Sequence, residues 1–211
     1  MAEQTKETEA TEVKTTATAT KKTAKKSTRT KMLKSEKITV SLGKKITVVF
    51  PGTSVTQREV YDAATMPNGA RSLVMLYQNF MNQIIDSPKI DWDYFDKKIA
   101  KEDRESEVVI TEDDGTEVTY KLTFPGVQEL LAIRDAATSS FGEVLDGPLF
   151  QGFIMDIIQS EDITDLDYFD SHNGYRTLMD TASNLMDSWL NDSEIYSYMN
   201  GVDAFIQRMF R

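Results

Sequence analysis

The chain has 211 residues, a net charge of −10 and no cysteine, so it holds no disulfide framework, thiolate metal site or cysteine nucleophile. No apolar run approaches the roughly 18 residues of a membrane-spanning helix. The N-terminal sequence MAEQTKETEATEV lacks the apolar core of a secretory signal. We therefore expect a cytoplasmic protein without a membrane segment.

Charge is divided unevenly along the chain. Residues 1–35 hold nine Lys/Arg against four Glu, whereas residues 36–211 hold 15 Lys/Arg against 30 Asp/Glu. The first segment has too few apolar side chains to offset the entropy lost on ordering, which predicts a disordered basic tail. This tail is interpreted either as an electrostatic arm for a partner or polyanion, or as a solubilising end. It has no aromatic residue to stack on bases, so nucleic-acid binding is disfavoured.

Predicted order begins near Ser35. Two runs rich in β-branched residues, 38–42 and 46–50, flank the turn signal Gly43-Lys44 and predict a hairpin that ends at Pro51-Gly52.

Helical patterns follow this hairpin. Thr56 and Glu59 have the spacing of a capping box, which predicts a short helix running to about Ala64. Over residues 70–86 the apolar residues recur at spacings of three and four, which predicts a long amphipathic helix. Ser87-Pro88 ends it.

A second hairpin is predicted in the middle of the chain, where an Asp-Gly pair (Asp114-Gly115) lies between runs rich in β-branched residues. Before it, Asp91 is expected to cap a short helix. The segment DWDYFD at 91–96 is similar to DLDYFD at 165–170. Chance would explain this similarity, and so would two similar helix starts. No internal repeat of fold size is expected.

Four more helices are predicted: from Val127 to a glycine cap at Gly142, from Pro148 to Gln159, around Leu178–Trp189, and after a cap at Ser193. The fold class is therefore mainly α with two small β-hairpins (α+β). The domain prediction is a tail at 1–35, a hairpin-plus-helix core at 36–146, and a C-terminal helical region at 147–211 packed on the core. A second lobe or a hinge is expected near residues 146–148.

The residue types argue against catalysis. The single histidine, His172, lies in a turn-like stretch without a nearby nucleophile motif. The acidic residues at 162–170 do not have the spacing of a calcium-binding loop, and no glycine-rich phosphate loop occurs. We assign no catalytic residue, no cofactor and no metal ligand, and we predict that the protein is not an enzyme.

Apolar helical faces are then the expected means of action. The predicted partner-binding residues are those on the long helix and on the last helix: Tyr77, Phe80, Ile84, Phe205, Met209 and Phe210. This assignment requires that they lie on the surface.

Short motifs give the chain a resemblance to a known family. They are Phe50-Pro51-Gly52, the helix end Ile84–Pro88, the acidic segment 91–96, and a helix opened by Phe124-Pro125-Gly126 and closed by 139–142. In this order they resemble the small tail assembly chaperones of long-tailed bacteriophages, with the baseplate-hub assembly chaperones as a related branch.

The resemblance implies a chaperone that binds the aggregation-prone tape-measure protein in the infected host's cytoplasm and keeps it soluble during tail assembly. The partner would be a protein client, with self-association left open, no membrane, and no catalytic residue. Two alternatives stay open: a structural virion component of the baseplate or connector, and a nucleic-acid-associated protein that acts through its basic tail.

Overall fold

The computed structural model describes residues 34–211. The predicted disordered tail therefore lies outside the described residues, except for Lys34 and Ser35, which belong to the first strand. The strands are β1 Lys34–Thr39, β2 Lys45–Phe50, β3 Ile85–Ser87, β4 Glu105–Thr111, β5 Glu117–Thr123 and β6 Ile158–Gln159.

The longer helices are α2 Leu73–Asn79, α4 Val127–Ala137, α5 Asp146–Asp156, α6 Tyr175–Asp192 and α7 Ile195–Met209, and the short ones are α1 Thr53–Val55 and α3 Trp92–Asp96. Single 3-10 or π turns complete them: η1 Ser41–Gly43, η2 Thr56–Tyr61, η3 Asp62–Ala64, η4 Phe80–Ile84, η5 Lys101–Asp103 and η6 Leu166–Asp170. The predicted class, mainly α with two small hairpins, is confirmed.

Each predicted hairpin is part of a three-stranded antiparallel sheet, in the orders β1-β2-β3 and β4-β5-β6. The hairpin turns contain glycines with positive φ, Gly43 at 72° and Gly115 at 84°, where an L side chain would be strained. The third strands were not predicted. They pair Ile85 with Val48 and Ile158 with Leu122.

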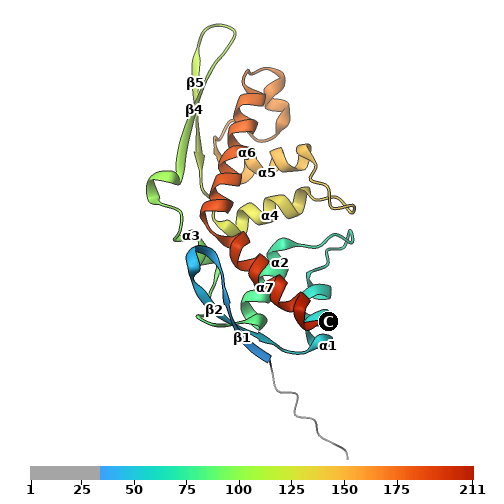
Figure 1. The fold of residues 1–211 in the computed structure, drawn as a ribbon. Coiled ribbons are helices and arrows are strands. Elements are labelled where there is room, and N and C mark those ends of the chain that lie inside the picture. The colour runs from blue at the N-terminus through green and yellow to red at the C-terminus, as the bar shows by residue number, and fades with distance from the viewer. Residues whose placement is uncertain (1–33) are drawn as a thin grey trace, which may run out of the picture. The chain divides into compact units, whose positions relative to one another are not determined.

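The described chain contains a duplicated unit, which corrects the expectation of no internal repeat. Residues 34–96 (the first repeat) and 104–170 (the second repeat) each contain a hairpin, a helix, a tight loop, a second helix, a short third strand and a DxDYFD segment (Figure 1). From the Phe-Pro-Gly sequence onward, equivalent residues are 73 or 74 positions apart, whereas the first strands and hairpin turns are offset by less. The shared sequences are Phe-Pro-Gly at 50–52 and 124–126, Asp-Ala-Ala-Thr at 62–65 and 135–138, and Ile-Ile-x-Ser at 84–87 and 157–160.

Backbone hydrogen bonds repeat with the sequence. The loop 65–71 is closed by a Thr65–Arg71 bridge, and the loop 138–144 by a Thr138–Val144 bridge. Gly69 and Gly142 occupy the same left-handed position in these loops, at φ 88° and 83°. Gly142 therefore serves the loop, and the helix predicted to end there ends at Ala137 instead.

The first repeat holds one residue more than the second between its Phe-Pro-Gly glycine and its Asp-Ala-Ala-Thr aspartate. The helix there absorbs the extra residue in the π-helical turn η2, because a π turn lengthens the hydrogen-bonded loop by one residue. Thr56 lies inside this helical run, and its hydroxyl donates to the Gly52 carbonyl at 2.9 Å. The capping box predicted from Thr56 and Glu59 is therefore wrong.

The two C-terminal helices pack along both repeats. Helix α6 contacts α4 and α5 of the second repeat, and α7 contacts β1 and β2 of the first. The phenylalanine of each Phe-Pro-Gly sequence meets an aromatic ring at the end of one of these helices edge-on: Phe124 with Trp189, at 5.5 Å between centroids, and Phe50 with Phe210, at 6.0 Å.

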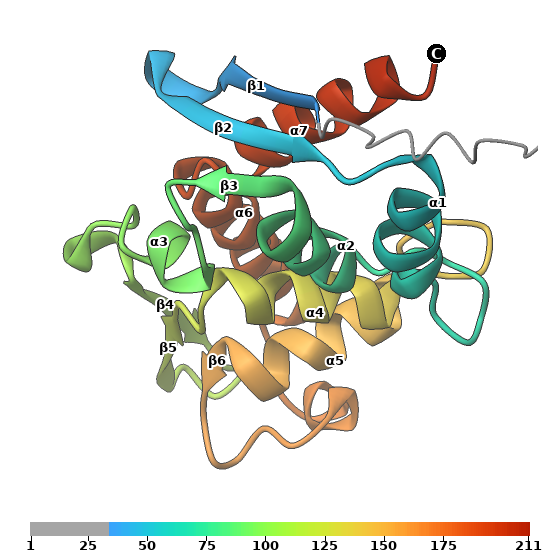
Figure 2. The same cartoon turned by 90° about the horizontal axis from the view of Figure 1, so that it is seen from below.

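Figures 1 and 2 both place α4 of the second repeat between α2 and α5. Residues 34–211 group as one compact unit, and residues 146–148, where a hinge was expected, form the first turn of α5. Within residues 34–211, no helix has the length and apolar character needed to cross a membrane.

Candidate functional site: an apolar and acidic surface on the second repeat

Most of the predicted partner-binding residues lie in the core. Tyr77 is 7% exposed, and Phe80, Ile84 and Phe205 are at most 1% exposed. Met209 and Phe210 are half-buried. A docking surface made of these six residues is therefore ruled out for the folded protein, because α2 and η4 are covered by the sheet and α4, and α7 lies against the first hairpin.

Large apolar side chains are exposed elsewhere. Eight are exposed within residues 34–211, and five of them fall between 141 and 175. Four of these five lie on the loop 138–144 and on or next to α5: Phe141 (90% exposed), Val144 (37%), Leu145 (47%) and Met155 (70%). We call these four residues the apolar patch.

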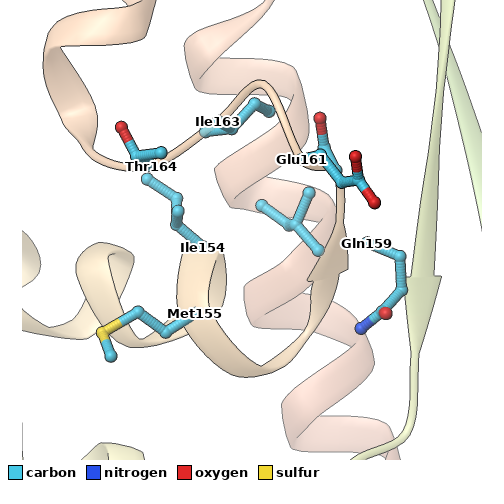
Figure 3. Close-up of a pocket in the computed structure, with 8 residues that line it drawn as sticks. Ile154, Met155, Gln159, Glu161, Ile163 and Thr164 are labelled. Carbon is cyan, nitrogen blue, oxygen red and sulfur yellow. The ribbon is translucent and has the colours of Figure 1, made fainter.

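Cavities border the apolar patch at both ends of α5. Phe141 and Val144 line a cavity of about 440 Å³ near the start of α5, and Val144 also lines one of about 240 Å³ beside α6. Met155 borders a third, of about 640 Å³, at the end of α5. Figure 3 shows the Ile154 side chain pointing toward the segment that carries Ile163 and Thr164, whereas Met155 points away from that segment. The patch thus adjoins three hollows, and the one beside Met155 is lined partly by polar residues, among them Gln159, Glu161 and Thr164.

The first repeat provides an internal reference for this surface. Its residues at the positions of the apolar patch are all polar: Asn68, Arg71, Ser72 and Asn82. Positions that are buried in the first repeat, in contrast, stay apolar in the second, where two of them are half-buried: Leu76, Tyr77 and Phe80 of α2 and η4 correspond to Leu149, Phe150 and Phe153 of α5. Since the first repeat folds with polar residues at these four positions, of which only Ser72 is buried, the fold does not require the apolar ones. Contiguous exposed apolar residues are typical of binding sites, and Phe141, Val144 and Leu145 lie together at the start of α5, with Met155 at its other end.

Local helix chemistry explains how Leu145 is tolerated. The equivalent Ser72 caps α2 by accepting a hydrogen bond from the Met75 amide at 3.0 Å. In α5 the residue equivalent to Met75 is Pro148, which has no amide hydrogen. A hydroxyl at position 145 would find no such amide donor. An apolar side chain at this position therefore removes no capping hydrogen bond from α5.

The surface is also strongly acidic. Between Arg134 and Arg176 the sequence holds nine Asp/Glu and no Lys or Arg, and every one of these acids except Asp135 is exposed. Asp135 is buried and accepts hydrogen bonds from Ser72 and from the Leu73 and Val74 amides, so its role is structural.

His172 lies at a different cavity, of about 530 Å³, formed by the second hairpin turn and residues 169–173. Its ring stacks on Tyr168 with 3.9 Å between centroids, and its Nδ1 lies 2.9 Å from the Tyr168 carbonyl oxygen. Within residues 34–211, no three His, Asp or Glu side chains are grouped so that they would hold a metal ion.

Sequence reasoning overlooked the apolar patch. The signal that would have found it is the duplication itself, because aligning Asp-Ala-Ala-Thr of the two repeats exposes the four polar-to-apolar differences. Searches of protein families, of characterised proteins and of solved structures each find no match to this chain.

Proposed function

We propose that this chain is a non-enzymatic assembly chaperone that binds the tape-measure protein of a long-tailed phage and keeps it soluble in the host cytoplasm until the tail tube forms. The observation that carries the binding role is the apolar patch, which the second repeat has and the first repeat lacks. The resemblance of the Phe-Pro-Gly helix starts and the acidic segments to tail assembly chaperones supports the choice of client.

The chemistry of the surface suits transient binding. Covering apolar area stabilises a complex by about 25 cal/mol per Å², and four side chains with adjoining cavities offer a small area of this kind. The exposed acids around the patch keep chaperone and complex soluble through repulsion. Moderate affinity then lets the polymerising tube compete for the same client surface.

Co-expression with the tape-measure protein tests this proposal. We expect the full chain to keep the client soluble and to co-purify with it. The informative variant gives the patch the residues of the first repeat: Phe141→Asn, Val144→Arg, Leu145→Ser and Met155→Asn. It should fold normally and lose the client.

Leu42→Asn is the matched control for this experiment. Leu42 is 85% exposed and lies on the first hairpin turn at φ 52°, a conformation that asparagine accepts readily. This variant should retain the client, and a patch variant that retains it equally well would contradict the proposal.

Mass spectrometry of purified particles separates a chaperone from a baseplate or connector component, because a chaperone is absent from the finished virion. A gel-shift assay with and without residues 1–35 at two salt concentrations tests the nucleic-acid alternative.

A further inference from the structure

Negative charge and apolar character occur together on the surface of the second repeat. Glu143, Asp146 and Asp156 each lie next to a residue of the apolar patch along the chain. Their equivalents in the first repeat are uncharged: Ala70, Leu73 and Gln83. The surface of the second repeat therefore differs from that of the first in two properties at once, and a partner has to match both.

These acids are free to meet a partner. None of the eight exposed acids between 143 and 170 forms an ion pair within residues 34–211. The two arginines of the nearest cavity are engaged elsewhere, since Arg134 donates to the Tyr196 hydroxyl at 3.2 Å and Arg71 lies over the Tyr61 ring. The acids at the rim of the patch are therefore unpaired within the described residues, while Arg71 and Arg134, whose contacts are with neutral groups, keep their charge beside Val144.

We infer that the segment bound by the apolar patch is a cationic amphipathic helix of a client protein. Its apolar stripe would cover Phe141, Leu145 and Met155, and its Lys or Arg residues would pair with Glu143, Asp146 and Asp156 at the rim. The inference rests on the binding role proposed above, but it does not depend on which protein supplies the helix.

A helix fits this surface better than a strand. An added strand needs a free sheet edge, and the edge strand near the patch, β6, has only two residues. From Leu145 to Met155 the chain advances ten residues along α5, about 15 Å at 1.5 Å per residue. A partner helix of roughly three turns spans this distance with apolar residues on one side and cations on its flanks.

Competing occupants match only part of the surface. Nucleic acid is repelled by the exposed acids. Residues 14–34 of a second copy carry eight Lys/Arg and no acid, but Met32 and Leu33 are their only sizeable apolar residues. They would match the charge of the surface and leave its apolar part uncovered.

Fluorescence anisotropy with the full-length protein tests the inference. Three labelled synthetic peptides of about 18 residues, long enough to form helix, serve as probes. The first has a leucine stripe flanked by lysines, the second the same stripe flanked by glutamates, and the third the lysines with serine in place of leucine. We expect the leucine–lysine peptide to bind at least about tenfold more tightly than either of the others.

Variants assign the binding to its site. The four-residue patch variant should weaken leucine–lysine binding about tenfold, a 1.4 kcal/mol change. The triple variant Glu143→Gln, Asp146→Asn and Asp156→Asn should weaken it and flatten its salt dependence. Leu42→Asn should leave it unchanged.

Equal binding of the leucine–glutamate peptide, equal binding of the serine–lysine peptide, or an unaffected patch variant would each overturn the inference. If the tape-measure protein still co-purifies in any of these cases, the proposed function stands without it. If the leucine–lysine peptide binds as expected and the tape-measure protein does not, the proposed client is wrong. The inference that the patch binds a cationic amphipathic helix then still holds.

Discussion

The Ser72 hydroxyl donates a 2.6 Å hydrogen bond to Asp135 Oδ2, and this contact joins α2 of the first repeat to α4 of the second. The same carboxylate accepts from the Leu73 amide at 2.9 Å and from the Val74 amide at 3.0 Å. A helix leaves its first amides without internal partners, and a carboxylate there also opposes the positive end of the helix dipole. The second repeat therefore completes a helix of the first.

Replacing Asp135 should be costly. Asp135→Ala removes three charge-assisted hydrogen bonds and leaves the buried Ser72 hydroxyl without its acceptor, so we expect a loss of about 2–4 kcal/mol of unfolding free energy. Asp62→Ala is the matched control, since the equivalent Asp62 is exposed and its carboxylate accepts only from Gln57 among residues 34–211. It should change the unfolding free energy by less than about 0.5 kcal/mol. Urea denaturation of both variants checks this, and similar losses would refute the role assigned to Asp135.

Gly152 should not tolerate a side chain. A Cβ at this position would lie 2.6 Å from Cγ2 of Ile133 in α4, so Gly152→Ala should destabilise the protein by about 1–3 kcal/mol through overpacking. The first repeat has Asn79 there, and its amide donates to the Val60 carbonyl at 3.1 Å. Gly147→Ala, with no atom within 4 Å of the added methyl group, serves as the control in thermal unfolding and should be neutral or slightly stabilising. Equal effects of the two substitutions would argue against this close α4–α5 approach.

The two aromatic contacts of the C-terminal helices should differ in strength. Trp189 is 1% exposed, and its indole nitrogen donates to the Asp103 carbonyl at 2.7 Å. We expect Trp189→Ala to cost about 3–5 kcal/mol. Phe210, which meets Phe50, is half-buried, so Phe210→Ala should cost distinctly less. Chemical denaturation ranks the two, and a larger loss for Phe210→Ala would contradict the packing described.

Acid should weaken the junction between α6 and α7 through Glu194. Burial alone would raise the pKa of this carboxyl, but Lys98 at 2.9 Å and Lys44 at 3.4 Å outweigh it and hold the pKa below its usual 4.5. A carboxyl group whose pKa is lower in the folded than in the unfolded protein stabilises the fold at pH values above its unfolded-state pKa. This stabilisation is lost as the pH falls through the folded-state pKa.

Glu194→Gln should therefore be less stable than the parent near neutral pH, and it should lose less stability than the parent between about pH 5 and pH 3. Urea midpoints at the two pH values measure the difference. Parallel pH profiles for the two proteins would show that Glu194 contributes nothing to acid sensitivity.

The correct sequence predictions rest on signals that involve only a few neighbouring residues, such as turn glycines and helix caps. The hairpins follow from Gly43 and from Asp114-Gly115, and the cap at Asp91 is confirmed because its carboxylate accepts from the Tyr94 amide at 3.0 Å. Strands β3 and β6 were missed because two or three residues show no alternation of apolar and polar side chains.

The site was missed for a different reason. A helical apolar stripe such as Tyr77 and Phe80 has the same period whether a partner or the protein's own core covers it. The duplication stayed hidden because single-residue insertions shift the spacing between 73 and 74, and because surface positions such as Asn68 and Phe141 have diverged. Once the repeats are aligned, the polar-to-apolar differences at these positions identify the apolar patch.

Hydrogen–deuterium exchange on the full chain, with and without the tape-measure protein, tests most directly whether the second repeat binds the client. We predict that binding slows exchange in residues 141–156 and leaves the equivalent residues 68–83 of the first repeat unchanged. Bound client with unchanged exchange at 141–156, or with equal protection at 68–83, would contradict a binding surface on the second repeat.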